Sequence, residues 1–89
     1  MGQTVCTRGA LKVLKALSPP ADIEALFRRH AEGDWGVMDA EDKASNEEAL
    51  KEGGTLHSAY QVAPTIKVWI ITEPDRSATT LLLPNEYEY

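Results

Sequence analysis

The spacing of apolar residues predicts two helices in the first third of the chain. Residues 8–17 carry one apolar stripe at helical spacing, formed by Leu11, Val13, Leu14 and Leu17. Residues 21–32 carry a second stripe, formed by Ile23, Leu26, Phe27 and His30. Thr7 is a suitable N-cap for the first helix. Pro19 and Pro20 end that helix, because proline cannot continue its hydrogen-bond ladder.

The pattern of residues 40–52 predicts a third helix, which is mostly polar. Asp39 precedes it as an N-cap, and Gly53 follows it as a stop signal. Leu50 is its only large apolar residue. Such a helix buries only a narrow strip, so we expect its outer face to be exposed and free to bind a partner.

The last third of the chain changes to the periodicity of strands. Residues 55–62 alternate between apolar and polar positions, as a strand with one buried face does. Residues 66–72 are apolar on both parities, which is typical of a central strand covered on both faces. Residues 78–83 form a third strand that ends at Pro84.

Together these elements predict an α+β fold in a single domain, residues 1–89. We expect N-terminal helices packed on a three-stranded antiparallel sheet, a β-meander at the C-terminus. Residues 3–6 are either a short edge strand or an extended lead-in to the first helix. A chain of 89 residues has room for one hydrophobic core and no second one.

The net charge of −5 is unevenly distributed. Between Glu32 and Glu52 eight acidic residues face only two lysines, Lys43 and Lys51. An acidic block of this kind repels nucleic-acid phosphates and favours basic partners; the alternative is a solvated face that keeps a small protein soluble. The single cysteine, Cys6, excludes an internal disulfide and, with no apolar leader, predicts a cytoplasmic protein.

No motif for catalysis or for cofactor binding is present. The chain lacks a P-loop, a dinucleotide-binding fingerprint and a nucleophile elbow. His30, His57 and Cys6 do not have zinc-site spacing, so we expect no metal and no cofactor. Basic residues are interleaved with the apolar stripes of the first two helices, which argues against direct nucleic-acid binding. No apolar run is long enough to span a membrane.

Short motifs along nearly the full length carry a resemblance. They are Gly2-Gln3-Thr4-Val5, Gly9-Ala10-Leu11, His30, Gly33-Asp34-Trp35-Gly36, Glu41-Asp42-Lys43, Asn46, Ala49-Leu50, Gly53, Ser58-Ala59-Tyr60, Val68-Trp69-Ile70-Ile71-Thr72-Glu73, Asp75-Arg76-Ser77, Thr79-Thr80 and Leu82-Leu83-Pro84. With them the chain resembles a family of small, uncharacterised bacterial proteins often carried on plasmids and phages. It departs at Ala63-Pro64-Thr65, where members have an Asp-Gly turn. The resemblance implies an accessory protein of mobile DNA, a class that often acts against host defences.

We hypothesise one continuous partner-binding surface made by the Trp35 loop, the acidic helix and the turn at residues 73–76. Its residues are Asp34, Trp35, Asp39, Glu41, Asp42, Asn46, Glu47, Glu48, Asp75 and Arg76. Structural roles are the alternative: Trp35 is then a core anchor, and Arg76 pairs with the carboxylate of Asp75 or Glu73.

The preferred function is a non-enzymatic protein that binds the basic, nucleic-acid-binding surface of another protein. Its concrete form is an anti-CRISPR or anti-restriction inhibitor. The alternative is a small enzyme or toxin-like hydrolase that uses His30 or His57 with Asp34 or Arg76. A third hypothesis is an accessory subunit that forms a homodimer.

Overall fold

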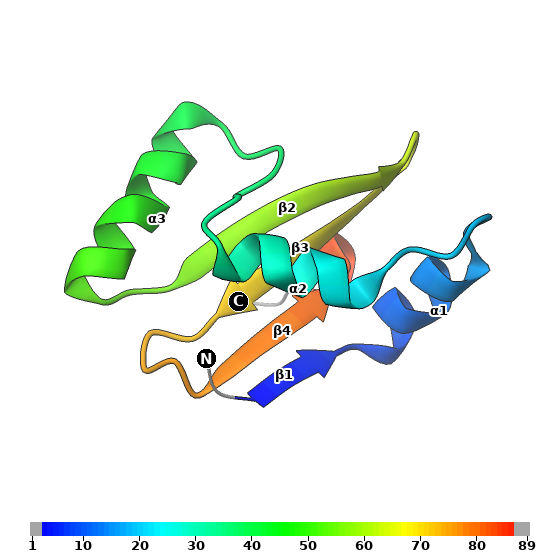
Figure 1. Cartoon of the computed structure of the whole chain (residues 1–89), viewed down its shortest axis with the longest axis horizontal. Helices are drawn as coiled ribbons and strands as arrows, with labels where there is room; N and C mark the ends of the chain where they lie inside the picture. Colours follow the sequence, from blue (N-terminus) through cyan, green and yellow to red (C-terminus); the bar gives the residue numbers. More distant parts are fainter. Residues whose placement is uncertain (1–2, 87–89) are drawn as a thin grey trace.

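The structure, a computed structural model, describes residues 3–86 and has an α+β fold (Figure 1). Its elements are β1 (Gln3–Cys6), α1 (Arg8–Ala16), α2 (Ile23–Ala31), α3 (Ala40–Glu52), β2 (Leu56–Ala63), β3 (Ile66–Thr72), β4 (Ala78–Leu82) and the 3₁₀ turn η1 (Pro84–Glu86). Residues 1–2 and 87–89 of the predicted domain lie outside the described residues. Among the described helices, none has both the length and the apolar character needed to cross a membrane.

The sheet has four strands and is mixed, so the predicted number of three strands, all antiparallel, was wrong; of the two alternatives for residues 3–6, the short edge strand is confirmed. The strand order is β1-β4-β3-β2. The predicted meander of β2, β3 and β4 is present and antiparallel. The additional strand, β1, pairs parallel with β4, from Gln3 opposite Ala78 to Cys6 opposite Leu81. A four-residue strand has too short a pattern to reveal such a distant partner, and only tertiary packing selects it.

The side chains on one face of the sheet pack with those of α1 and α2 to form the main core. The buried members are Ala10, Leu14, Leu26, Tyr60, Val68, Ile70 and Leu81. Figure 1 shows α2 crossing in front of β3 and β4, with α3 beyond β2 at the other side of the view from β1. A second, smaller cluster joins Trp35, Ala49 and Leu56 and fixes α3 against β2.

The helix caps explain where the helices begin. The predicted caps are confirmed: the Thr7 hydroxyl accepts from the Ala10 N–H at 3.1 Å, and the Asp39 carboxylate accepts from the Asp42 N–H at 2.8 Å. The second helix begins two residues later than predicted, because the Asp22 carboxylate accepts from the Ala25 N–H and acts as its N-cap.

The outer edge of β2 is covered by the segment that leads from α2 to α3. The Val37 N–H donates to the Ala59 carbonyl at 2.8 Å, and the Ala59 N–H donates to the Trp35 carbonyl at 3.2 Å. Gly36 lies between these two bonds with φ 73°, and a Cβ added there would overlap the Ala59 carbonyl oxygen. Glycine is therefore required at this position by both its backbone conformation and the close approach of β2.

We expect Gly36→Ala to lower the free energy of unfolding by more than about 2 kcal/mol, because it adds backbone strain and forces the segment away from β2. Gly33→Ala is the matched control: Gly33 also has a positive φ, 84°, but its added Cβ meets nothing closer than 3.9 Å. Gly33→Ala should lower the free energy of unfolding only by the backbone strain, about 1 kcal/mol. Urea denaturation compares the two, and equal losses would contradict the role of the close approach.

Candidate functional site

The exposed side of α3 carries two rows of side chains. Glu41, Glu48 and Glu52 lie at spacings of seven and four residues and therefore share one flank; we call them the acidic row. Lys43, Glu47 and Lys51, each four residues apart, follow the other flank. All three residues of the acidic row are exposed. Residues 3–86 contain a single ion pair, Arg29–Asp34, so no cation neutralises the acidic row directly.

Asn46 holds α3 to the edge of β2. Its side-chain amide donates to the His57 carbonyl at 2.6 Å and accepts from the His57 N–H at 3.0 Å. Asn46 is only 3% exposed. The side-chain amide thus makes the two hydrogen bonds that a neighbouring strand would make to His57. Asn46 therefore has a structural role and is not part of an exposed surface.

Trp35 is a core residue, as the structural alternative holds. It is 5% exposed and packs with Ala49 and Leu56. Its indole N–H donates to the Glu47 carboxylate at 2.8 Å. A buried indole needs such a partner, so Glu47 serves the attachment of α3 and is not free for another protein.

Arg76 binds the C-terminal end of α3, not a carboxylate. Its guanidinium donates to the carbonyls of Ala49 at 2.9 Å and Gly54 at 2.6 Å, with a longer bond of 3.2 Å to Glu73. Pairing with the side chain of Asp75 or Glu73, the structural alternative, is absent within residues 3–86. The Ala49 carbonyl also accepts from the Gly53 N–H at 2.9 Å, and a cation at this end of a helix interacts favourably with the helix dipole. The turn and α3 are therefore adjacent, as the hypothesis of one surface requires.

Asp75, in the same turn, keeps its carboxylate at the surface. It accepts from the Ser77 N–H at 3.0 Å, and hydrogen bonds from Ser77 lower the pKa of Asp75. The bond to its own turn is a structural role, since it stabilises the chain reversal between β3 and β4.

Asp34 closes the loop that follows α2. Its carboxylate binds the Arg29 guanidinium at 2.7 Å and accepts from the Gly36 N–H at 3.1 Å. The hydrogen bond from Arg29 is the main reason why the pKa of Asp34 is lowered. The Asp34 carbonyl accepts from the Tyr60 hydroxyl at 2.6 Å, and Arg29 stacks over the Tyr60 ring at 4.5 Å. The carboxylate and the backbone carbonyl of Asp34 therefore both make hydrogen bonds within the fold.

Three of the ten predicted surface residues are exposed and have no side-chain hydrogen bond among the described residues. They are Glu41, Asp42 and Glu48. Glu52 belongs with them on the surface and was not among the predicted site residues. Its position four residues after Glu48 and eleven after Glu41 was the available signal, because both spacings place it on the same helical flank.

His30 is the centre of a buried polar network. Its Nδ1 lies 2.6 Å from the Ser58 hydroxyl and its Nε2 lies 2.8 Å from the Thr72 hydroxyl, which in turn lies 2.8 Å from that of Thr79. His30 is 2% exposed, and burial is the main cause that lowers its pKa to about 4, with a smaller effect of His57. At neutral pH one ring nitrogen therefore donates and the other accepts.

The two histidines of the hydrolase alternative have other neighbours in the fold. His30 and Ser58 are in contact, but Ser58 is 0% exposed and no substrate reaches it. His57 packs edge-on against Trp69, with ring centroids 4.5 Å apart, and burial lowers its pKa. Within residues 3–86 no hydrogen bond or ion pair joins either histidine to Asp34 or Arg76. Nor do these residues include a group of three or more side chains placed to hold a metal ion.

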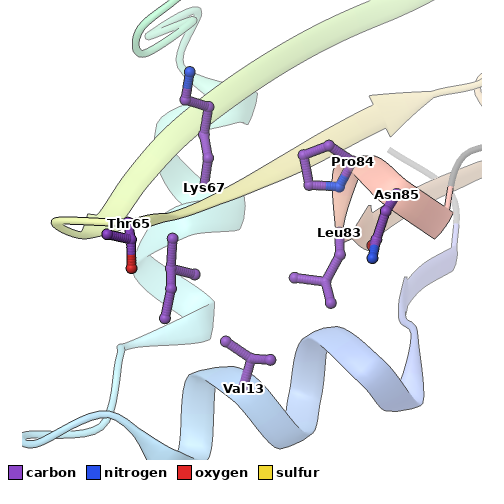
Figure 2. A pocket seen from close by; sticks show the side chains of 7 residues that line it. Val13, Thr65, Lys67, Leu83, Pro84 and Asn85 are labelled. Atoms are coloured by element: carbon purple, nitrogen blue, oxygen red, sulfur yellow. The ribbon is translucent and has the colours of Figure 1, made fainter.

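A cavity of about 390 Å³ lies between α1, the turn from β2 to β3, and the segment entering η1 (Figure 2). Its lining residues are Val13, Thr65, Ile66, Lys67, Leu83, Pro84 and Asn85. Val13 and Leu83 point toward each other, whereas the amino group of Lys67 points away from them (Figure 2). None of the predicted site residues lines this cavity, whose lining combines apolar side chains with the polar side chains of Thr65 and Asn85 and with Lys67.

No protein-family model, curated protein or solved structure matches this chain. The resemblance to plasmid- and phage-associated proteins therefore stays a prediction.

We expect Asn46→Ala to lower the free energy of unfolding by about 1–3 kcal/mol, because both His57 backbone groups lose their partner. Ser45→Ala is the control: Ser45 is the preceding residue of α3 and is exposed, so its change should stay within about 0.5 kcal/mol. Urea denaturation measures both. A loss no larger for Asn46→Ala than for Ser45→Ala would show that the two hydrogen bonds do not hold α3.

We expect acid to destabilise the protein between about pH 6.5 and pH 4. His30 stays neutral in the fold down to about pH 4, whereas the unfolded chain binds the proton near pH 6.5. The unfolded state then holds more protons, so the free energy of unfolding falls with falling pH, by at most about 1.4 kcal/mol per pH unit. Denaturation curves of wild type and His30→Gln across this window test this, and parallel pH dependences would contradict it.

Proposed function

We propose that this protein binds another protein through the acidic row of α3. One observation carries the proposal: Glu41, Glu48 and Glu52 are exposed on one flank of a helix without an ion-pair partner among the described residues. Carboxylates with no internal role are available to bind cations on a partner. The carboxylates of Asp34, Asp39 and Glu47, by contrast, are used to build the fold.

The attachment of α3 supports this proposal. Asn46, Glu47 and the Ala49 carbonyl each make hydrogen bonds that hold the helix to the rest of the fold. A helix held in this way presents its carboxylates in one arrangement, which lowers the entropy lost on binding.

The spacing of the acidic row favours a partner surface that binds nucleic acid. With a rise of about 1.5 Å per residue, Glu41 and Glu48 lie about 10 Å apart along the helix, and Glu48 and Glu52 about 6 Å. The row therefore presents a line of negative charges about 6 to 10 Å apart on a fixed helix, and a nucleic-acid backbone is likewise a line of closely spaced negative charges. Lysines and arginines arranged for a phosphate backbone are therefore a suitable counterpart.

The concrete form of the proposal is a non-enzymatic, cytoplasmic inhibitor of a host defence system, of the anti-CRISPR or anti-restriction type. It would compete with nucleic acid for a basic surface on the defence protein. Besides the acidic row, its support is the resemblance to proteins of plasmids and phages.

The test uses two variants with the same change in net charge. In the first, Glu41, Glu48 and Glu52 are replaced by lysine; in the matched control, Glu24, Glu32 and Glu73, all exposed and outside α3, are replaced by lysine. Asp42 and Glu47 are left intact, since Asp42 acts on the pKa of His57 and Glu47 binds Trp35. Each tagged protein is used to capture partners from a bacterial lysate, and double-stranded DNA is added as a competitor.

We expect wild type and the control variant to retain a nucleic-acid-binding protein that DNA displaces. The acidic-row variant should lose at least about tenfold in affinity, because three attractive contacts become repulsive. Equal retention by the acidic-row variant, or loss in both variants, would reject the acidic row as the binding surface.

A further inference from the structure

The two edges of the sheet differ in how their backbone groups are satisfied. At the β2 edge, the segment 35–37 and the side chain of Asn46 bind the backbone of Ala59 and His57. At the β1 edge, no backbone or side-chain group of the described chain binds the backbone groups that face away from β4. Figure 1 shows β1 at the border of the sheet with no described segment beyond it. An open edge of this kind is a template for another strand.

The backbone groups that face outward from β1 belong to Thr4 and Cys6. The Gln3 N–H donates to the Ser77 carbonyl and the Thr7 N–H to that of Leu81, both at 3.0 Å, so these two residues point toward β4. Successive residues of a strand alternate in direction. Val5 therefore also points its N–H and carbonyl toward β4, whereas those of Thr4 and Cys6 point away from the sheet.

We propose that β1 pairs antiparallel with β1 of a second copy of this chain, across a twofold axis at Val5. Thr4 of each copy then exchanges two hydrogen bonds with Cys6 of the second copy. Val5 lies opposite Val5 of the second copy as a pair without hydrogen bonds, in which side chains are closest. Val5 is 40% exposed in the single chain, and this contact would cover it.

The sequence of β1 favours pairing with the same strand of a second copy. Gln3–Cys6 contains no charge and no proline, two of the features with which exposed edges prevent self-association. A strand pairing about its own midpoint is also self-complementary, as a twofold interface must be. The register fits this requirement, because Thr4 and Cys6, the two outward-facing residues, are symmetric about Val5.

The position of the negative charge is compatible with this dimer. The strand order places β1 at the edge away from β2, to which α3 is bound. With strands about 4.8 Å apart, the β2 strands of the two copies would lie over about 30 Å from each other, well beyond the screening length of about 8 Å at physiological salt. The two acidic helices therefore do not oppose the pairing. A four-residue strand buries little area, so the dimer is of the transient class.

Two substitutions at β1 test the pairing without using the acidic row. Thr4→Pro removes an outward N–H and leaves the bonds of Gln3 and Thr7 to β4 intact. Val5→Lys places two ammonium groups side by side at the axis. The matched control is the acidic-row variant described above, which changes charge at the far edge. Light scattering gives the mass from about 10 µM to about 1 mM protein, a range suited to weak association.

The wild type and the acidic-row variant should approach twice the 9.8 kDa chain mass at the highest concentration. Thr4→Pro and Val5→Lys should stay monomeric, with circular dichroism melting curves showing that both are folded. In hydrogen exchange, the Thr4 and Cys6 amides should be protected at high concentration in the wild type and not in Val5→Lys. A wild type that stays monomeric at about 1 mM, or a dimer that persists in folded Val5→Lys, would overturn the proposal.

Discussion

The attachment of α3 through polar groups is the constraint on which the candidate site depends. This helix has little apolar surface to bury, since only Asn46 and Ala49 are buried among its residues. Hydrophobic packing alone therefore does not position it. Asn46 binds the backbone of β2, Glu47 binds the Trp35 indole, and Arg76 binds the carbonyl of Ala49. Each of these bonds has a partner in a different element, and together they fix both the position and the rotation of α3.

The rotation of α3 divides its acidic residues into two groups. Glu47 faces Trp35 and is engaged by it. Glu41, Glu48 and Glu52 face away and have no partner among the described residues. A count of acidic residues in the sequence treats all of them alike. The anchoring bonds show which carboxylates are structural, and the remaining ones define the surface that we propose for binding.

The buried network around His30 stabilises the fold by a different balance of forces. Desolvation keeps the imidazole neutral, and a neutral ring can donate from one nitrogen and accept with the other. The Ser58 and Thr72 hydroxyls lie 2.6 and 2.8 Å from the two ring nitrogens, and one hydroxyl accepts while the other donates. The network connects α2 with β2, β3 and β4, near the end of the sheet at which β3 ends and β4 begins. The same arrangement that resembles a Ser–His pair is thus explained by polar satisfaction, because Ser58 has no exposed surface.

The sequence by itself determined the elements whose signals are local. Periodicity, caps and stop residues predicted both bounds of α3 and the start of α1, since these depend on neighbours within a few residues. Only the tertiary structure decided the parallel pairing of β1 with β4 and the partners of Arg76, Asn46 and Glu47. Those contacts join residues distant in the chain or depend on how a helix is rotated. No local pattern encodes them, because packing across the whole fold selects among several partners that are locally equivalent.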